Sequence, residues 1–184
     1  MLKTTAFAAL LLIAMPPMAL AGKYHLGKIA TTEDIRARDI TILPDGSGLP
    51  QGAGTAKEGR TIYAQQCAMC HGFKGEGSGA YPKLVGGRGT LRSANPTLTV
   101  GSYWPYATTL WDYIHRAMPP QNPGSLSAHD IYSLAAFILF MNGIIKENDE
   151  INAKTLPAVK MPNRDGFIPD PRPDIKVVKP KSPK

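Results

Sequence analysis

The sequence has very few cysteines: Cys67 and Cys70 are the only two among 184 residues. A bridge across Cys-x-x-Cys closes a loop too short to constrain much of the chain, so a stabilising disulfide framework is excluded. A thioredoxin-type redox pair would need a surrounding βαβ pattern, and a zinc site would need more thiolates or histidines nearby. Neither feature is present in the sequence. The two thiols must therefore have another purpose.

Long apolar runs are also scarce. The one candidate, residues 6–15, follows Lys3 and precedes the small residues at positions 19–21, which is the arrangement of a secretory signal peptide. We therefore expect residues 1–21 to be cleaved and the mature protein to lie in the periplasm. An uncleaved membrane anchor is the alternative, but this run is shorter than the ~20 apolar residues that span a bilayer. We expect no stable membrane insertion.

Acidic residues are fewer than basic ones, 14 against 21, and the formal net charge is +7. A basic chain can bind nucleic acid, but export argues against this role, and the sequence shows no motif that combines aromatic and basic residues for such binding. We therefore expect no nucleic acid partner. The positive charge is better explained by an acidic protein partner, which it would attract over a distance.

Residues 67–71 read Cys-Ala-Met-Cys-His, the pattern for covalent attachment of haem c. Two thiols three positions apart on a helical turn can form thioethers along one porphyrin edge, and the adjacent His71 can bind the iron as proximal ligand. A simple disulfide would not require the histidine. The sequence therefore predicts one covalent haem c, held by Cys67, Cys70 and His71.

The distal iron ligand must come from another part of the chain. The candidates are Met69, Met118, Met141, Met161, His25, His115 and His129. Met118 follows a short predicted helix and precedes two prolines, so a loop can place its thioether on the opposite haem face. His115, one helical turn away, is the main rival, although a histidine on such a helix is commonly solvated. The sequence favours Met118, and two filled axial positions favour electron transfer over oxygen or peroxide chemistry.

Four further residues are expected beside the haem. The carbonyl group of Pro82 is the favoured acceptor for the second ring nitrogen of His71. Trp104 and Tyr106 are candidates to cover the haem, and ordinary core packing is their alternative role. Arg116 is a candidate to neutralise a propionate, and a solvated arginine is the alternative.

Helix signals surround the motif, and no segment shows sustained strand alternation. Thr55 and Glu58 form a capping-box pattern before the motif, Thr108 or Thr109 can cap a second helix, and Ser127 caps a last helix. Gly143 is a plausible stop for that last helix. The sequence predicts an all-α fold.

The predicted fold is a small monohaem class I cytochrome c domain over residues 55–145. Residues 22–54 are rich in turn signals, and we expect an N-terminal arm that lies over the core. Residues 146–184 form an extended C-terminal tail, rich in proline and charge from residue 157 onward. Such a composition does not build its own core, so the tail is either a solvated end or an arm along a partner subunit.

Several longer runs resemble the cytochrome subunit of sulfur (sulfane) dehydrogenase in the Sox thiosulfate-oxidation system. The runs are residues 101–109, 112–114, 116–119, 142–145, 160–167 and 170–174, with residues 43–50 near the start. The likeness extends over nearly all of the chain that follows the predicted signal peptide. Haem cytochromes in general share only the attachment motif and the methionine loop, so these other runs carry the finer resemblance.

The resemblance implies a partner subunit with a molybdopterin cofactor, where a sulfur compound is oxidised. This chain would then pass electrons from that subunit to a downstream acceptor cytochrome c. Some family members carry a second haem domain, whereas this chain has a single attachment motif, so sulfane sulfur and sulfite both remain open as the partner's substrate. A freely diffusing monohaem carrier of another respiratory chain is the alternative function, and a cytochrome that is itself an enzyme is a third.

Overall fold

The computed structural model describes residues 28–170 and residue 172, so the predicted signal peptide and most of residues 171–184 lie outside the described part. The chain divides into two units, residues 1–39 and residues 40–184. The first unit contains α1 (Thr32–Arg36), which Thr31 and Asp34 cap reciprocally and which has no buried residue. The second unit contains all the residues that were predicted to bind a cofactor.

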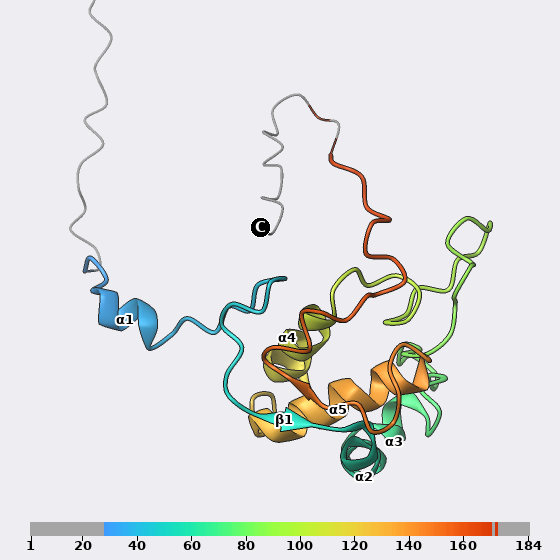
Figure 1. The fold of residues 1–184 in the computed structure, drawn as a ribbon, viewed down its shortest axis with the longest axis horizontal. Coiled ribbons are helices and arrows are strands. Elements are labelled where there is room, and N and C mark those ends of the chain that lie inside the picture. Colours follow the sequence, from blue (N-terminus) through green and yellow to red (C-terminus); the bar gives the residue numbers. More distant parts are fainter. Residues whose placement is uncertain (1–27, 171, 173–184) are drawn as a thin grey trace, which may run out of the picture. The chain divides into compact units, whose positions relative to one another are not determined.

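The second unit is a small helical domain, which confirms the predicted all-α class (Figure 1). Its elements are β1 (Ala53–Gly54), α2 (Ala56–Gln66), α3 (Ala68–His71), α4 (Ala107–Ala117), α5 (Ala128–Met141) and β2 (Ile151–Asn152). The two short strands pair antiparallel, with Ala53 opposite Asn152. None of the helices in the described residues is long and apolar enough to cross a membrane.

Local capping chemistry explains where two of the helices begin. Thr55 starts α2 and Ser127 starts α5, each within a complete capping box, as the sequence predicted. The prediction that Thr108 or Thr109 caps α4 is wrong. The N-cap position is Tyr106, two residues before Thr108, and it has no side-chain cap. The Thr108 side chain is instead buried within the first turn.

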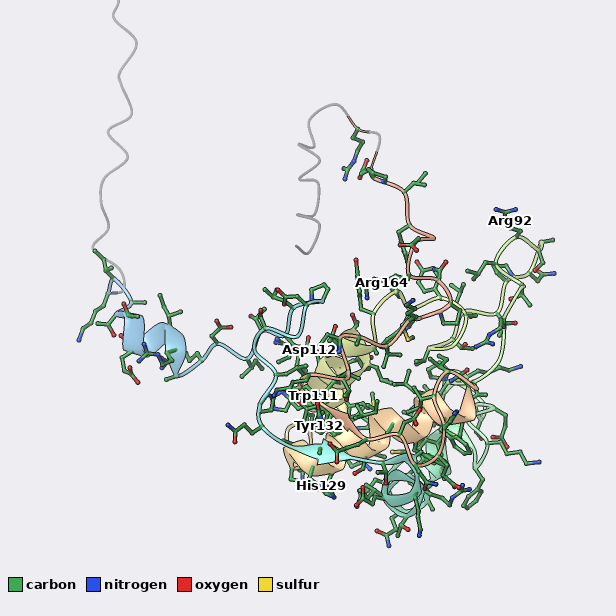
Figure 2. The ribbon with its side chains drawn as sticks, viewed as in Figure 1. Arg92, Trp111, Asp112, His129, Tyr132 and Arg164 are labelled. Carbon is green, nitrogen blue, oxygen red and sulfur yellow. The ribbon has the colours of Figure 1, made fainter. Side chains whose placement is uncertain are left out.

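The core is built around α5. Every residue from Ile131 to Leu139 is buried, so this helix is covered on all sides, as expected of an apolar central helix. Trp111 of α4 and Tyr132 of α5 lie in the interior with their ring centroids 5.6 Å apart (Figure 2). The helix ends before Gly143, whose φ of 64° suits a residue without a side chain.

Both flanking segments add to this core. Ile42 and Leu49 pack against it from the N-terminal side, and the hydroxyl of Tyr132 donates a hydrogen bond to the Pro50 carbonyl at 2.8 Å. On the C-terminal side, Leu156 and Met161 are 0% and 3% exposed. The core therefore includes residues outside the 55–145 range assigned from the sequence.

Candidate functional site

A cavity of about 370 Å³ opens between the helices of the second unit. Its walls come from the end of α2 and α3, the loop at residues 81–84, the loop at residues 98–104, and one face each of α4 and α5. The aliphatic part of the wall includes Leu84, Leu110, Ile114, Leu126, Leu134 and Ile138. An apolar pocket with a few convergent polar groups is the usual form of a cofactor site.

The predicted attachment residues lie together on one wall of the cavity. Cys67 ends α2 and precedes α3, and the amides of Cys70 and His71 donate to its carbonyl at 3.1 and 2.9 Å. This single turn brings both thiols and the imidazole to the cavity lining. Burial, and secondarily Cys70, raises the pKa of the Cys67 thiol to about 11, so this thiol is neutral at neutral pH.

His71 is oriented by the backbone. Its Nδ1 lies 2.9 Å from the carbonyl oxygen of Pro82, the acceptor favoured from the sequence. An Nδ1–H donated to that carbonyl leaves Nε2 with a free lone pair. The next residue is also held, because the Tyr63 hydroxyl donates to the Gly72 carbonyl at 2.9 Å. The His71 ring is thus held by the Pro82 carbonyl, and the backbone that follows it is held by Tyr63.

Met118 also lines the cavity, as the residue that directly follows α4. Its amide donates to the Ile114 carbonyl at 3.0 Å, which fixes the start of the proline loop. The rival His115 is not among the lining residues, and its ring packs 5.1 Å from that of Trp111. Met161 is buried in the core away from the lining.

The three remaining predicted residues are placed differently. Trp104 lines the cavity, with its ring centroid 5.8 Å from that of Tyr113. Tyr106 is not a lining residue, and the Arg164 guanidinium lies over its ring at 4.5 Å. Arg116 is also not brought to the cavity.

The position of Arg116 has a clear physical cause. Its Nε donates to Asp112 at 2.7 Å, one helical turn back, and a second nitrogen donates to the Ile40 carbonyl at 2.8 Å. The ion pair and the carbonyl contact hold the guanidinium at the N-terminal flank. The candidate role at a propionate stays a prediction.

Asn142 is a residue that the sequence analysis missed. Its Nδ2 donates to the carbonyls of Leu84 and Ile138 at 3.1 and 2.9 Å, and its Oδ1 accepts from the Gly86 amide at 3.2 Å. These contacts tie the end of α5 to the loop that carries Pro82. An asparagine before Gly143 signals only a helix end, so its links to a distant loop had no sequence signal.

Comparisons with known proteins place the chain among haem proteins. Residues 54–138 match the family model described as cytochrome c oxidase, cbb3-type, subunit III. Cytochrome c-554(547) of Halothiobacillus neapolitanus is 36% identical over 90 residues, which cover 47% of this chain and 96% of that protein. A thiosulfate dehydrogenase of Stutzerimonas stutzeri (strain A1501) is 33% identical over 113 residues, covering 59% of this chain.

The solved structures add a match that extends further along the chain. One chain in the crystal structure of the sulfane dehydrogenase SoxCD from Paracoccus pantotrophus is 42% identical, with a TM-score of 0.75. The match covers 82% of this chain and 74% of that one. By contrast, the matched segment spans only 33% of the length of the Stutzerimonas thiosulfate dehydrogenase.

Proposed function

Since the chain belongs to the c-type cytochromes and is related to a chain of the sulfane dehydrogenase SoxCD, we propose that it carries single electrons on one covalent haem c. The main support for this proposal is that all four predicted haem-binding residues line one cavity. Cys67, Cys70 and His71 line one wall of it, and Met118 also contributes to the lining. Two thiols, an imidazole and a thioether are the donor set of a cytochrome with methionine–histidine ligation.

The cavity fits a haem in chemistry as well as in donor set. Its aliphatic lining suits a flat apolar macrocycle, and neither Cys67 nor Cys70 is used in a disulfide. Cys67 and Cys70 would hold the haem covalently, and His71 Nε2 and the Met118 sulfur would bind its iron. When bound, the haem supplies a one-electron Fe(III)/Fe(II) couple.

The protein's own groups would hold and insulate that couple. The Pro82 carbonyl accepts the Nδ1 proton of His71, which fixes the tautomer and makes the ligand nitrogen more basic. Aliphatic side chains of α4 and α5 exclude water from the cavity and so favour the less charged ferrous state. Because His71 and Met118 would both bind the iron, a substrate would have no ligation site, which favours an electron carrier over an enzyme.

We further propose that this carrier is the haem subunit of a molybdenum-containing sulfane or sulfite dehydrogenase. It would accept electrons from a molybdopterin subunit and pass them to a downstream cytochrome c in the periplasm. The support is the SoxCD match, whose 42% identity extends well beyond the 85-residue family model. Residues 1–21 would direct export as a cleaved signal peptide.

Haem attachment is tested by expression in a host that matures c-type cytochromes. We expect one haem per chain in the denatured protein, measured as the pyridine haemochrome and by intact mass. Cys67→Ala and Cys70→Ala should each reduce covalent haem. Met69→Ala, which lies between them and is 84% exposed, is the matched control and should leave it unchanged. Colourless protein without haem mass would refute the proposal.

Met118 ligation is tested by the weak long-wavelength charge-transfer band of the ferric protein. Met118→Ala should abolish this band, because the iron–thioether bond that produces it is lost. Met69→Ala should retain the band. If the band persists in Met118→Ala, another residue is the distal ligand.

The partner assignment is tested on material purified from the native source. We expect the cytochrome to copurify with a larger subunit that contains molybdenum by elemental analysis. Addition of sulfite or of carrier-bound sulfane sulfur should then reduce its haem, and the two substrates distinguish the two dehydrogenase classes. A cytochrome that purifies alone and is reduced by neither would instead be a freely diffusing carrier.

A further inference from the structure

The C-terminal segment is attached to its own domain by several independent contacts. We call residues 151–168 the strap. It begins with β2, which pairs with β1, and it places Leu156 and Met161 in the core. Beyond Met161, the strap runs beside the loop that enters α4, and Arg164 lies in this region (Figure 2). The strap is thus anchored before it reaches that loop.

Three contacts join the strap to residues 103–106, which we call the aromatic loop. Asn163 Nδ2 donates a hydrogen bond to the Tyr103 carbonyl at 2.7 Å. The Phe167 ring packs edge-on against Tyr103, with centroids 5.2 Å apart. The Arg164 guanidinium lies 4.5 Å from the centroid of the Tyr106 ring, within the range of a cation–π contact.

The Asn163 side chain is held in place from within the strap. A Cβ built on Gly166 would overlap the Asn163 amide oxygen, so the backbone at Gly166 packs directly against this side chain. The Gly166 amide also donates to the Asn163 carbonyl at 3.1 Å. The donor that reaches Tyr103 is therefore fixed by a tight turn.

The aromatic loop has two sides. The strap contacts the Tyr103 carbonyl and ring and the Tyr106 ring, whereas Trp104 between them lines the cavity and packs against Tyr113. On its N-terminal side, the loop is fixed by the Tyr103 amide, which donates to the Thr99 carbonyl at 3.0 Å. The two neighbours of Trp104 in the loop are therefore held by Asn163, Arg164 and Phe167 of the strap, none of which lines the cavity.

We infer that the strap holds Trp104 in the cavity wall, with Asn163 and Arg164 as positioning residues that keep water from the cofactor. This inference rests on the proposed haem function. If the strap is released, the aromatic loop relaxes outward, Trp104 moves with it, and water enters at that wall. Water stabilises the more highly charged ferric state, so the reduction potential falls.

The test is the midpoint potential of the holoprotein in two variants that preserve net charge. Asn163→Ala removes the donor to Tyr103, and Arg164→Lys removes the planar group over Tyr106. We expect each to lower the ferrous-to-ferric ratio at a fixed potential by about threefold or more, equal to ~28 mV at 59 mV per tenfold change for one electron. Asn95→Ala and Arg92→Lys, both at exposed sites in another loop, are the matched controls and should leave the ratio unchanged.

A double-mutant cycle separates positioning of Trp104 from a general loss of structure. In a Trp104→Phe background, Asn163→Ala should shift the potential much less than in the wild type, because the group that it positions has been replaced. A full shift in that background, or shifts in both strap variants no larger than in the controls, would overturn the inference. If Asn163→Ala fails to fold, Arg164→Lys carries the same test.

The haem content of every variant is measured alongside. Because Asn163 and Arg164 do not line the cavity, each variant should retain one covalent haem per chain. If haem is present and the potentials are unchanged, the role of the strap is refuted but the proposed haem function is not. Absence of haem from the wild type as well would refute the proposed function.

Discussion

Gly59→Ala provides a direct test of how α2 is placed against α5. A Cβ added at Gly59 would overlap the carbonyl oxygen of Ser133 and would lie 2.9 Å from the Cβ of Phe137. The obstacle is backbone in a helix whose residues 131–139 are all buried, so it cannot turn aside as a flexible side chain would. The two helices must therefore separate.

Two opposing effects set the magnitude. At an exposed helix site, replacement of glycine by alanine stabilises by ~1 kcal/mol. Here, overpacking costs about 1–3 kcal/mol or more. Separation of the helices also weakens the contact between the rings of Tyr63 and Phe137, whose centroids are 5.2 Å apart. An aromatic pair of this kind contributes about 1 kcal/mol. The steric term is larger, and we expect a net loss of about 2 kcal/mol in the free energy of unfolding.

The assay is urea unfolding of the ferric holoprotein, followed by far-ultraviolet circular dichroism. With a slope of about 2 kcal/mol/M, the midpoint should fall by about 1 M. Thr61→Ala, at an exposed position of the same helix, is the control and should leave the midpoint unchanged or slightly raised. A midpoint for Gly59→Ala equal to or above that of the wild type would refute the close crossing of the two helices.

Three further predictions concern stability. Burial raises the pKa of Tyr132 from about 10 to about 12, so the contribution of its neutral phenol to the free energy of unfolding is complete below pH 10 and is lost as the pH rises towards 12. Tyr132→Phe should flatten this alkaline decline in the free energy of unfolding. Ser133 Oγ is buried without a hydrogen-bond partner among the described residues, so Ser133→Ala should raise the unfolding free energy by about 1 kcal/mol, and a loss would reveal a hidden partner. Thr55→Ala removes the cap that accepts from the Glu58 amide and should cost about 1 kcal/mol in the same assay, whereas an unchanged midpoint would show that the cap does not stabilise α2.

The parts of the fold that could be predicted depend on neighbours in sequence. The capping boxes at Thr55 and Ser127 involve side chains three residues apart, so the pattern alone locates the helix starts. The start of α4 could not be located in this way. Tyr106 offers no capping side chain, and Thr108 is drawn into the core by tertiary packing that a local pattern does not encode.

The same distinction applies to the site. Cys67, Cys70 and His71 fall within one helical turn, so their joint arrival at the cavity follows from local geometry. The roles considered for Tyr106 and Arg116 depended instead on which partners tertiary structure would provide. In the structure, the Arg164 guanidinium lies over the Tyr106 ring, and Arg116 donates to Asp112 and to the Ile40 carbonyl. Arginine has several donors, and sequence alone does not say which acceptor is nearest.

The flanking segments explain why this chain is longer than a minimal cytochrome. The 90-residue match to cytochrome c-554(547) covers 96% of that relative, and the family model ends at residue 138. Here, Leu156 and Met161 are buried beyond that limit, and the strap then contacts the loop that bears Trp104. The SoxCD match covers 82% of this chain, so it must include residues outside the family model. Because the added length contacts the residues on either side of Trp104, it is placed to act on the cavity wall from outside, as the inferred role of the strap requires.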